Sequence, residues 1–469
     1  MSILAQRKLL FLLGVISLIV SVWFFSSWNY MREHYHSMVL LPFTYGWMLI
    51  LLSRCPSLNI FKTIAILSYS IKLLVTPWFV TTIGERELQI GIHYYVYNHI
   101  TEAVLLQVLE IVTVSIFLYS LSNHREKRTQ NIFTVSPHRL SWRILLFFCF
   151  AGFVLVAMYP QFLYKFQPVF LDKEAYYALQ DLGATVKGSM NLYIYHLGYW
   201  IVTLTKLLLV YVLIYILYRI THGGNWFSLI VSFVVVLVSC LFTTSDRAAT
   251  VYTAIAGLIL IYKLYVKHRV FVSRFSTLFT VGGVFIIFLY GAIFKSDDAI
   301  SEVGYKLNAY FAGTLNVAAC FDMSDSKLFE TLMGDVLRNI PLVVGFFVNL
   351  PMSYLEFNRA LGYDATYNSQ ILPVIGQGYY YFGVIGAVLF PIIMFKIAYF
   401  FYNHIRYSRD SFEYFSYLIA LIYTFLGVNL YDMFLTMGLV LQYGIPMLAI
   451  CLLSYLQKRE VYEERTYLL

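Results

Sequence analysis

Four cations of this chain lie beside apolar sequence, where a fixed positive charge can hold an anionic group. Arg247 lies in "TSDRAAT" (244–250), a short polar connector between two apolar runs, and Lys173 lies in "DKEAYY" (172–177). Arg338 and Arg359 stand on either side of an apolar stretch, "LVVGFFVNL" (342–350). A guanidinium group binds phosphate oxygens in pairs, and preorganised cations stabilise an anion in a site of low dielectric constant. These four residues are therefore candidates for binding an anionic group.

Each arginine also has a nearby carboxylate that offers a purely structural explanation. Arg247 follows Asp246, Arg338 follows Asp335 by one helical turn, and Arg359 follows Glu356 by three residues. Side chains three or four residues apart on a helix face one another and can pair. Arg338 also suits the negative end of its own helix. The sequence leaves both explanations open for all three arginines.

Several residues at the predicted outer surface could act as a general base. Asp364 is favoured because it lies between Arg359 and a Pro/Gly-rich segment, whereas the alternatives Glu356, Glu174 and His196 have no distinctive spacing. Aromatic rings can stack on a ligand while their phenol groups form hydrogen bonds with it. The candidates for that role are Tyr176 and Tyr177 in "EAYYAL" (174–179), and Tyr379 and Tyr380 in "GYYYFG" (378–383).

These residues must be positioned by a membrane-embedded helical fold. The chain of 469 residues is 60% hydrophobic and 12% charged, whereas a soluble domain is about 25% charged. Long apolar segments with few charges are candidate membrane-spanning helices. They predict an all-α polytopic membrane protein with about twelve spans, at residues 9–27, 37–53, 60–82, 98–121, 143–159, 192–218, 226–243, 248–266, 275–294, 379–402, 411–430 and 433–456.

The distribution of Lys and Arg predicts the orientation. The cations gather in the connectors 123–143, 262–274 and 403–410 and in the C-terminal segment 457–465, which the positive-inside rule places in the cytoplasm together with both termini. The net charge of +8 then reflects topology, and no nucleic-acid partner is expected. The five scattered cysteines form no zinc or disulfide pattern, and we expect neither a metal nor a cofactor.

Residues 1–469 therefore form one integral membrane domain with two long outer loops, 160–191 and 295–378. Within the larger loop, apolar spacing predicts amphipathic helices over 302–319 and 327–339, the second ending at Pro341. The stretch 342–350 is too short to span and either re-enters the bilayer or lies on its surface. Gly376 and Gly378 either admit a ligand close to the backbone or punctuate the start of the next helix.

Three charged residues fall inside predicted spans, where a charge is costly: Lys72, Lys206 and Glu110. An ion pair between Lys72 and Glu110 across two helices is the structural explanation, and we favour it over proton coupling.

The combination of these features resembles the Wzy-type polymerases of O-antigen and capsular polysaccharide repeat units. The matching stretches are "TSDRAAT" (244–250), "RNIP" (338–341) and "SQILPVIGQGYYYFGVIG" (369–386) within a similar overall plan of spans and loops. Two positions depart from the family pattern. Lys173 stands where the first outer loop often has an arginine, and Gln377 stands where a glutamate is common.

The resemblance implies a GT-C-like architecture and a glycosyltransferase of the bacterial plasma membrane. Such an enzyme transfers the growing glycan from undecaprenyl diphosphate to the non-reducing end of a new lipid-linked repeat unit on the outer face, beside a flippase and a chain-length regulator. In that scheme Arg338 and Asp364 are catalytic, with Asp364 as the base for the acceptor sugar hydroxyl. The diphosphate is held by Arg247, Arg359 and Lys173, and the sugar rings are bound by Tyr176, Tyr177, Tyr379 and Tyr380. An O-antigen-ligase-like transferase and a lipid-linked oligosaccharide flippase are the alternatives.

Overall fold

The computed structural model consists of helices joined by turns and short connectors. It describes residues 3–83, 94–121, 133–162, 185, 188, 191–241, 247–276, 278, 307–308, 311, 313–324, 326–340, 343–347, 349–362, 371–430 and 432–467. Within these residues, nine helices are long and apolar enough to cross a membrane: Ile3–Ser26, Glu33–Ser53, Ile60–Thr81, Tyr97–Ser120, Arg139–Met158, Leu192–Ile220, Val374–Ile405, Ser411–Asn429 and Met433–Leu456. The chain is thus an all-α, multi-pass membrane protein.

The nine helices coincide with nine of the predicted spans. Two further predicted spans, 226–243 and 248–266, correspond to the shorter apolar helices Trp226–Ser239 and Tyr252–Leu264. The remaining one, 275–294, falls almost entirely outside the described residues. The total of twelve spans stays a prediction.

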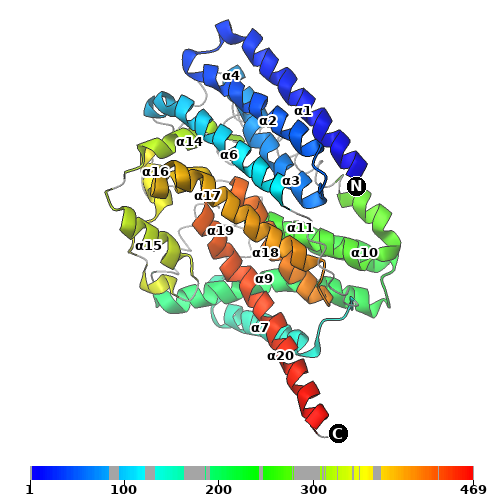
Figure 1. Ribbon diagram of the computed structural model, residues 1–469. Helices are drawn as coiled ribbons and strands as arrows, with labels where there is room; N and C mark the ends of the chain where they lie inside the picture. Colours follow the sequence, from blue (N-terminus) through cyan, green and yellow to red (C-terminus); the bar gives the residue numbers. More distant parts are fainter. Residues whose placement is uncertain are drawn as a thin grey trace.

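The helices form two packed groups (Figure 1). The first contains α1 (Ile3–Ser26), α2 (Leu40–Ser53), α3 (Ile60–Ser70), α4 (Thr76–Ile83) and α6 (Ile100–Ser120). The second contains α7 (Arg139–Met158), α9 (Leu192–Ile220), α10 (Trp226–Leu241) and α11 (Arg247–Leu264). The C-terminal helices α17 (Val374–Ile405), α18 (Ser411–Leu430) and α19 (Met433–Leu439) lie between the groups and supply apolar side chains to both cores. Helix α20 (Ile445–Tyr467) packs on the second group and extends past α7.

One end of the helix bundle is rich in cations, which we call the basic end. Arg7 donates to the carbonyl of Cys55, and Lys62 donates to the carbonyl of Leu121 where α6 ends. Arg409 lies over the ring of Tyr455 near the other end of the chain. This clustering agrees with the charge pattern that predicts a cytoplasmic face here.

The opposite end carries a small helical layer, which we call the cap. It comprises α14 (Thr314–Ala319), the turn Cys320–Asp322, α15 (Leu328–Arg338), the turn Val344–Phe346 and α16 (Ser353–Ala360). Leu315 and Phe357 are fully buried in the first core, so the cap is packed onto the spans. The predicted topology places the cap outside the cytoplasm.

Of the two helices predicted in the large loop, one is present as predicted and the other is not. The helix over 327–339 is confirmed by α15. The single helix over 302–319 is wrong, because Gly313 is extended, with φ −64° and ψ 177°, and α14 begins only after it. In the stretch 342–350, residues Val344–Phe346 form one 3₁₀ turn.

Helix α17 begins earlier than the predicted span 379–402 and is broken near its start. Gly376 and Gly378 lie inside the helix rather than before it, so their interpretation as punctuation is wrong. At Gly383 the backbone has φ 60° and ψ −149°, a conformation essentially restricted to glycine. The break separates a short N-terminal piece, 374–381, from the long span, and that piece lies beneath the cap.

Candidate functional site in the cap

Helix α15 turns its polar face toward the protein and its apolar face outward. Thr331, Gly334 and Asp335 are its buried residues. A Cβ atom on Gly334 would lie 1.8 Å from the carbonyl oxygen of Pro351, so only glycine permits this approach. The close contact brings the side chain of Asp335 against the start of α16.

Asp335 accepts hydrogen bonds from three neighbouring side chains and one backbone amide. The Ser353 amide donates to Oδ1 at 2.9 Å, and the Ser353 hydroxyl donates to Oδ2. The side chains of Gln377 and Tyr381, one turn apart on the short piece of α17, donate to Oδ2 at 2.9 and 2.7 Å. Asp335 thus joins α15, α16 and α17.

A second carboxylate, Asp432, belongs to the same cluster. Its Oδ1 accepts from Nε2 of Gln377 at 3.1 Å and from the Leu435 amide at 2.9 Å, so it caps the N-terminus of α19. The side-chain oxygen of Gln377, Oε1, accepts a hydrogen bond from the backbone N–H of Met433 at 2.9 Å. Gln377 therefore bridges two carboxylates, a role that a negatively charged glutamate could not fill in the same way.

The cluster is buried and contains two carboxyl groups. Asp335 is 2% exposed and Asp432 is 7% exposed, and no Lys or Arg among the described residues forms an ion pair with either. Burial raises the pKa of Asp335, and its hydrogen bonds oppose that rise. Burial and then the charge of Asp335 raise the pKa of Asp432 to about 7. The cluster is out of reach of a substrate and serves to hold α15 on the spans.

Arg338 lies at the C-terminal end of α15 and does not pair with Asp335. Its Nη1 donates to the carbonyl oxygen of Leu350 at 2.7 Å, and within the described chain it has no carboxylate partner. Burial raises the pKa of Tyr354, and the nearby positive charge of Arg338 reduces that rise. The structural pairing considered for Arg338 is therefore not formed, and its remaining donors suit an anion.

The outward face of α15 is apolar. Phe329 is 74% exposed, and Met333 and Val336 are also exposed. The surface continues through the exposed Phe346, whose ring centroid lies 5.7 Å from that of Tyr193 at the start of α9. Because α9 is a candidate span, this apolar surface joins the cap to a lipid-facing helix.

Arg359 has the structural partner considered for it. Its Nη1 forms an ion pair with Oε1 of Glu356, and its side chain is 57% exposed. An exposed pair at this spacing stabilises a helix only slightly. Its role in diphosphate binding stays a prediction.

The predicted aromatic residues of α17 face the turn Cys320–Asp322. The ring centroid of Tyr379 lies 4.5 Å from that of Phe321. The hydroxyl of Tyr380 donates to the carbonyl of Ser324 at 2.9 Å, and Tyr380 is 9% exposed. Tyr379 is thus the better placed of the two for a sugar.

The other predicted site residues are not tested. Arg247 is the first residue of α11, but its side chain lies outside the described part of the structure. Lys173, Tyr176, Tyr177 and Asp364 lie outside the described residues altogether.

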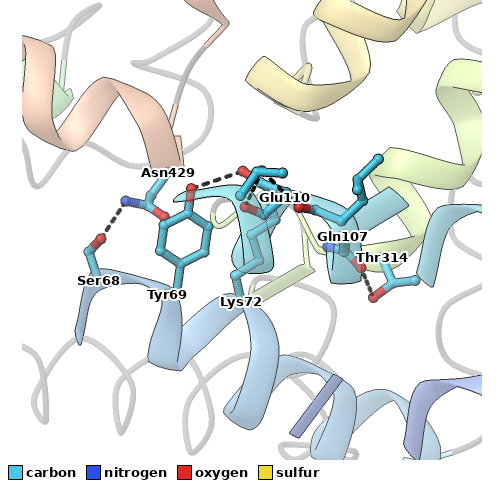
Figure 2. A network of polar contacts seen from close by, with 9 residues as sticks. Ser68, Tyr69, Lys72, Gln107, Glu110, Thr314 and Asn429 are labelled. Atoms are coloured by element: carbon cyan, nitrogen blue, oxygen red, sulfur yellow. Dashed lines mark hydrogen bonds and ion pairs between the residues drawn. The ribbon is translucent and has the colours of Figure 1, made fainter. Parts of the chain in front are cut away.

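A separate polar cluster lies in the middle of the first helix group (Figure 2). Lys72 and Glu110 are 2% and 1% exposed and form an ion pair at 2.7 Å, which confirms the predicted pairing. The Tyr69 hydroxyl donates to the other oxygen of Glu110 at 3.0 Å. Lys72 lies in the widened π-helical turn Ile71–Val75 that connects α3 to α4. Nearby, Thr314 of the cap donates to Gln107 of α6 at 2.9 Å.

Sequence reasoning did not assign a role to Asp432 and treated Gln377 only as a departure from a family pattern. An aspartate just before an apolar helical run is a typical N-cap, and this signal was available for Asp432. Its contact with Gln377 was not predictable from spacing. Within the described part of the chain, no group of three His, Cys, Asp or Glu side chains is arranged to hold a metal ion.

No protein-family model, curated protein or solved structure matches the chain.

Proposed function

We propose that this protein is a membrane glycosyltransferase that polymerises lipid-linked oligosaccharide repeat units, as the resemblance to Wzy-type polymerases suggests. In this proposal the growing glycan leaves undecaprenyl diphosphate and is joined to a new lipid-linked unit at the outer face of a bacterial plasma membrane. The protein would carry out this step in the cap and at the ends of the helices beneath it.

One observation carries the proposal. Helix α15 presents Phe329, Met333 and Val336 outward and ends with Arg338, which has no carboxylate partner among the described residues. A polyprenyl diphosphate requires the same two features, an apolar surface for its chain and a cation for its diphosphate. The apolar surface also continues to α9, along which a lipid could reach α15 from the bilayer.

The polar cluster beneath α15 supports the proposal in a different way. Asp335, Gln377 and Asp432 fix α15 to α17 and α19, so Arg338 is held on a rigid support. A preorganised cation stabilises a leaving diphosphate more than a mobile one does, because it need not reorient as charge develops. The amphipathic helix therefore has both a lipid-facing surface and a fixed position.

The test is the surface glycan of a strain from which the chain has been deleted. We expect the strain to display glycan of a single repeat unit and to recover long chains when the wild-type protein is restored. Surface glycan that is absent altogether would contradict the proposal and favour a flippase. Long chains that are polymerised normally but not attached to their acceptor would contradict it and favour the ligase-like transferase.

A further inference from the structure

A histidine and an aspartate meet at the edge of the cap, away from the buried carboxylate cluster. His99 immediately precedes α6, and Asp322 ends the turn that follows α14. Nε2 of His99 lies 3.3 Å from Oδ1 of Asp322, and the two side chains are 34% and 27% exposed. A substrate in the outer solution can therefore reach the pair.

The contact defines which nitrogen of His99 is available. In the neutral imidazole one nitrogen carries the proton and the other accepts one. Because Nε2 faces the carboxylate of Asp322, Nε2 carries the proton and Nδ1 is left as the acceptor. This arrangement is that of a general base with a positioning carboxylate.

An aromatic row adjoins the pair. The ring of Phe321 lies nearly parallel to that of His99, with centroids 5.5 Å apart and an angle of 14° between the planes. Phe321 in turn contacts Tyr379, with centroids 4.5 Å apart. Aromatic faces carry partial negative charge, which suits the weakly positive C–H groups of a sugar ring. A sugar bound beside this row would have its hydroxyls near His99.

We propose that His99 and Asp322, together with Phe321 and Tyr379, form the acceptor-sugar site, and that His99 is the catalytic base. The inference rests on the proposed polymerase function. Nδ1 of His99 removes the proton of the acceptor hydroxyl while its oxygen bonds to the anomeric carbon of the donor glycan. The bond from that carbon to the diphosphate breaks, the diphosphate leaves with the electron pair, and the proton later passes from His99 to water.

Stability alone does not account for the pair. A partly exposed contact of this kind contributes little to folding, because water competes for both side chains. The cap is already fixed by the buried side chains of Leu315, Val317 and Phe357 in the first core. Asp322 is therefore a positioning residue, and its effect should appear in turnover rather than in folding.

The experiment uses the full-length protein in proteoliposomes, with the lipid-linked repeat unit extracted from the deletion strain as substrate. We expect His99→Gln to lower kcat about 10²- to 10⁴-fold with KM nearly unchanged, the range for loss of a general base. Asp322→Asn should lower kcat by about tenfold or more, and Asp322→Glu should restore part of it. Added imidazole should partly rescue His99→Gly, because the site is open to solvent.

His36→Gln is the matched control. His36 also lies at the cap end of the bundle and stacks on an aromatic ring, Trp28, at 4.0 Å, but its Nε2 contacts a backbone oxygen rather than a carboxylate. This variant should keep wild-type kcat.

Two results would contradict the base assignment but leave the polymerase function standing. The first is that wild-type protein lengthens the glycan and His99→Gln does so at the same rate. The second is a loss of activity in His99→Gly that added imidazole does not restore. If the wild-type protein does not lengthen the glycan at all, both the polymerase function and the base assignment are wrong.

Discussion

Two buried polar clusters among the described residues differ in charge: one pairs a cation with a carboxylate, and the other joins two carboxyl groups. In the middle of the spans, Lys72 and Glu110 form a balanced pair, with Tyr69 completing the hydrogen bonds of the carboxylate. Beneath the cap, Asp335 and Asp432 are joined through neutral Gln377, and no described cation pairs with them. Both clusters connect helices that are far apart in the sequence.

The difference indicates what each cluster does. A balanced pair needs no outside ligand, since each charge satisfies the other, and we infer that Lys72 and Glu110 lock α3 and α4 against α6. The carboxylate pair accepts hydrogen bonds only from neutral donors, and Arg338 donates to the carbonyl of Leu350 instead of to either carboxylate. In the proposed function Arg338 binds an external anion. The following substitutions test this contrast, from the largest expected effect to the smallest.

Removing one charge of the balanced pair should have the largest effect. Lys72→Met leaves Glu110 buried without a counter-ion, which costs about 3–5 kcal/mol in comparable buried pairs. We expect a large fall in the thermal unfolding temperature of the purified protein in detergent. The double variant Lys72→Met/Glu110→Met should recover most of the loss, because it removes both charges. If Lys72→Met is as stable as the wild-type protein, the ion pair does not hold α3 and α4 against α6.

Arg338→Ala should abolish function without unfolding the protein. Loss of one preorganised donor to a developing anion typically lowers turnover about 10²- to 10³-fold. We expect that loss in repeat-unit extension by proteoliposomes, with the unfolding temperature nearly unchanged. Lys327→Ala is the control, because Lys327 is an exposed cation at the opposite end of α15 with no assigned role, and it should retain most activity. Normal extension by Arg338→Ala would refute the role of the α15 cation.

Gly334→Ala should separate α15 from its support. The added Cβ would lie 1.8 Å from the Pro351 carbonyl oxygen, so α15 must move and the Asp335 hydrogen bonds must weaken. We expect a destabilisation of about 1–3 kcal/mol, as for other overpacked sites, and slower extension. Gly188→Ala, where a Cβ meets no atom within 4 Å, serves as the control. If both variants behave alike, the contact does not position the helix.

The carboxylate pair should make stability depend on pH. The pKa of Asp432 is about 7 in the folded protein, above its usual value of about 3.9 in an unfolded chain. Between these values the folded state holds the extra proton, so stability falls as the pH rises from about 4 to about 7. Lowering the pH from 7.5 to 5.5 should raise the unfolding temperature by roughly 2–4 °C. Asp432→Asn should reduce this dependence, and an unchanged profile would contradict the assignment.

The parts of the fold that local sequence determines were predicted correctly. Apolar length located the described spans, and the spacing of Phe329, Met333 and Val336 with Pro341 located α15. The Lys72–Glu110 pair followed from the cost of an isolated charge in the membrane. The spans and α15 could be inferred from single segments of sequence, and the ion pair from the high free-energy cost of an unpaired charge inside the membrane.

The parts that depend on packing were not predicted. Gly313 interrupts an otherwise regular apolar pattern, and the pattern alone gave a helix that is too long. Gly376 lies inside α17, where a Cβ would meet the sulfur of Cys320, a contact between segments distant in sequence. The link from Asp335 through Gln377 to Asp432 joins three such segments. Spacing carries no information about contacts of this kind.

The most direct measurement is the binding of undecaprenyl diphosphate to the purified protein, compared with undecaprenol by native mass spectrometry. The account predicts that wild-type protein retains the diphosphate lipid in preference to the alcohol, and that Arg338→Ala loses this preference whereas Lys327→Ala keeps it. Equal retention of the two lipids by wild-type protein, or an unchanged preference in Arg338→Ala, would contradict it.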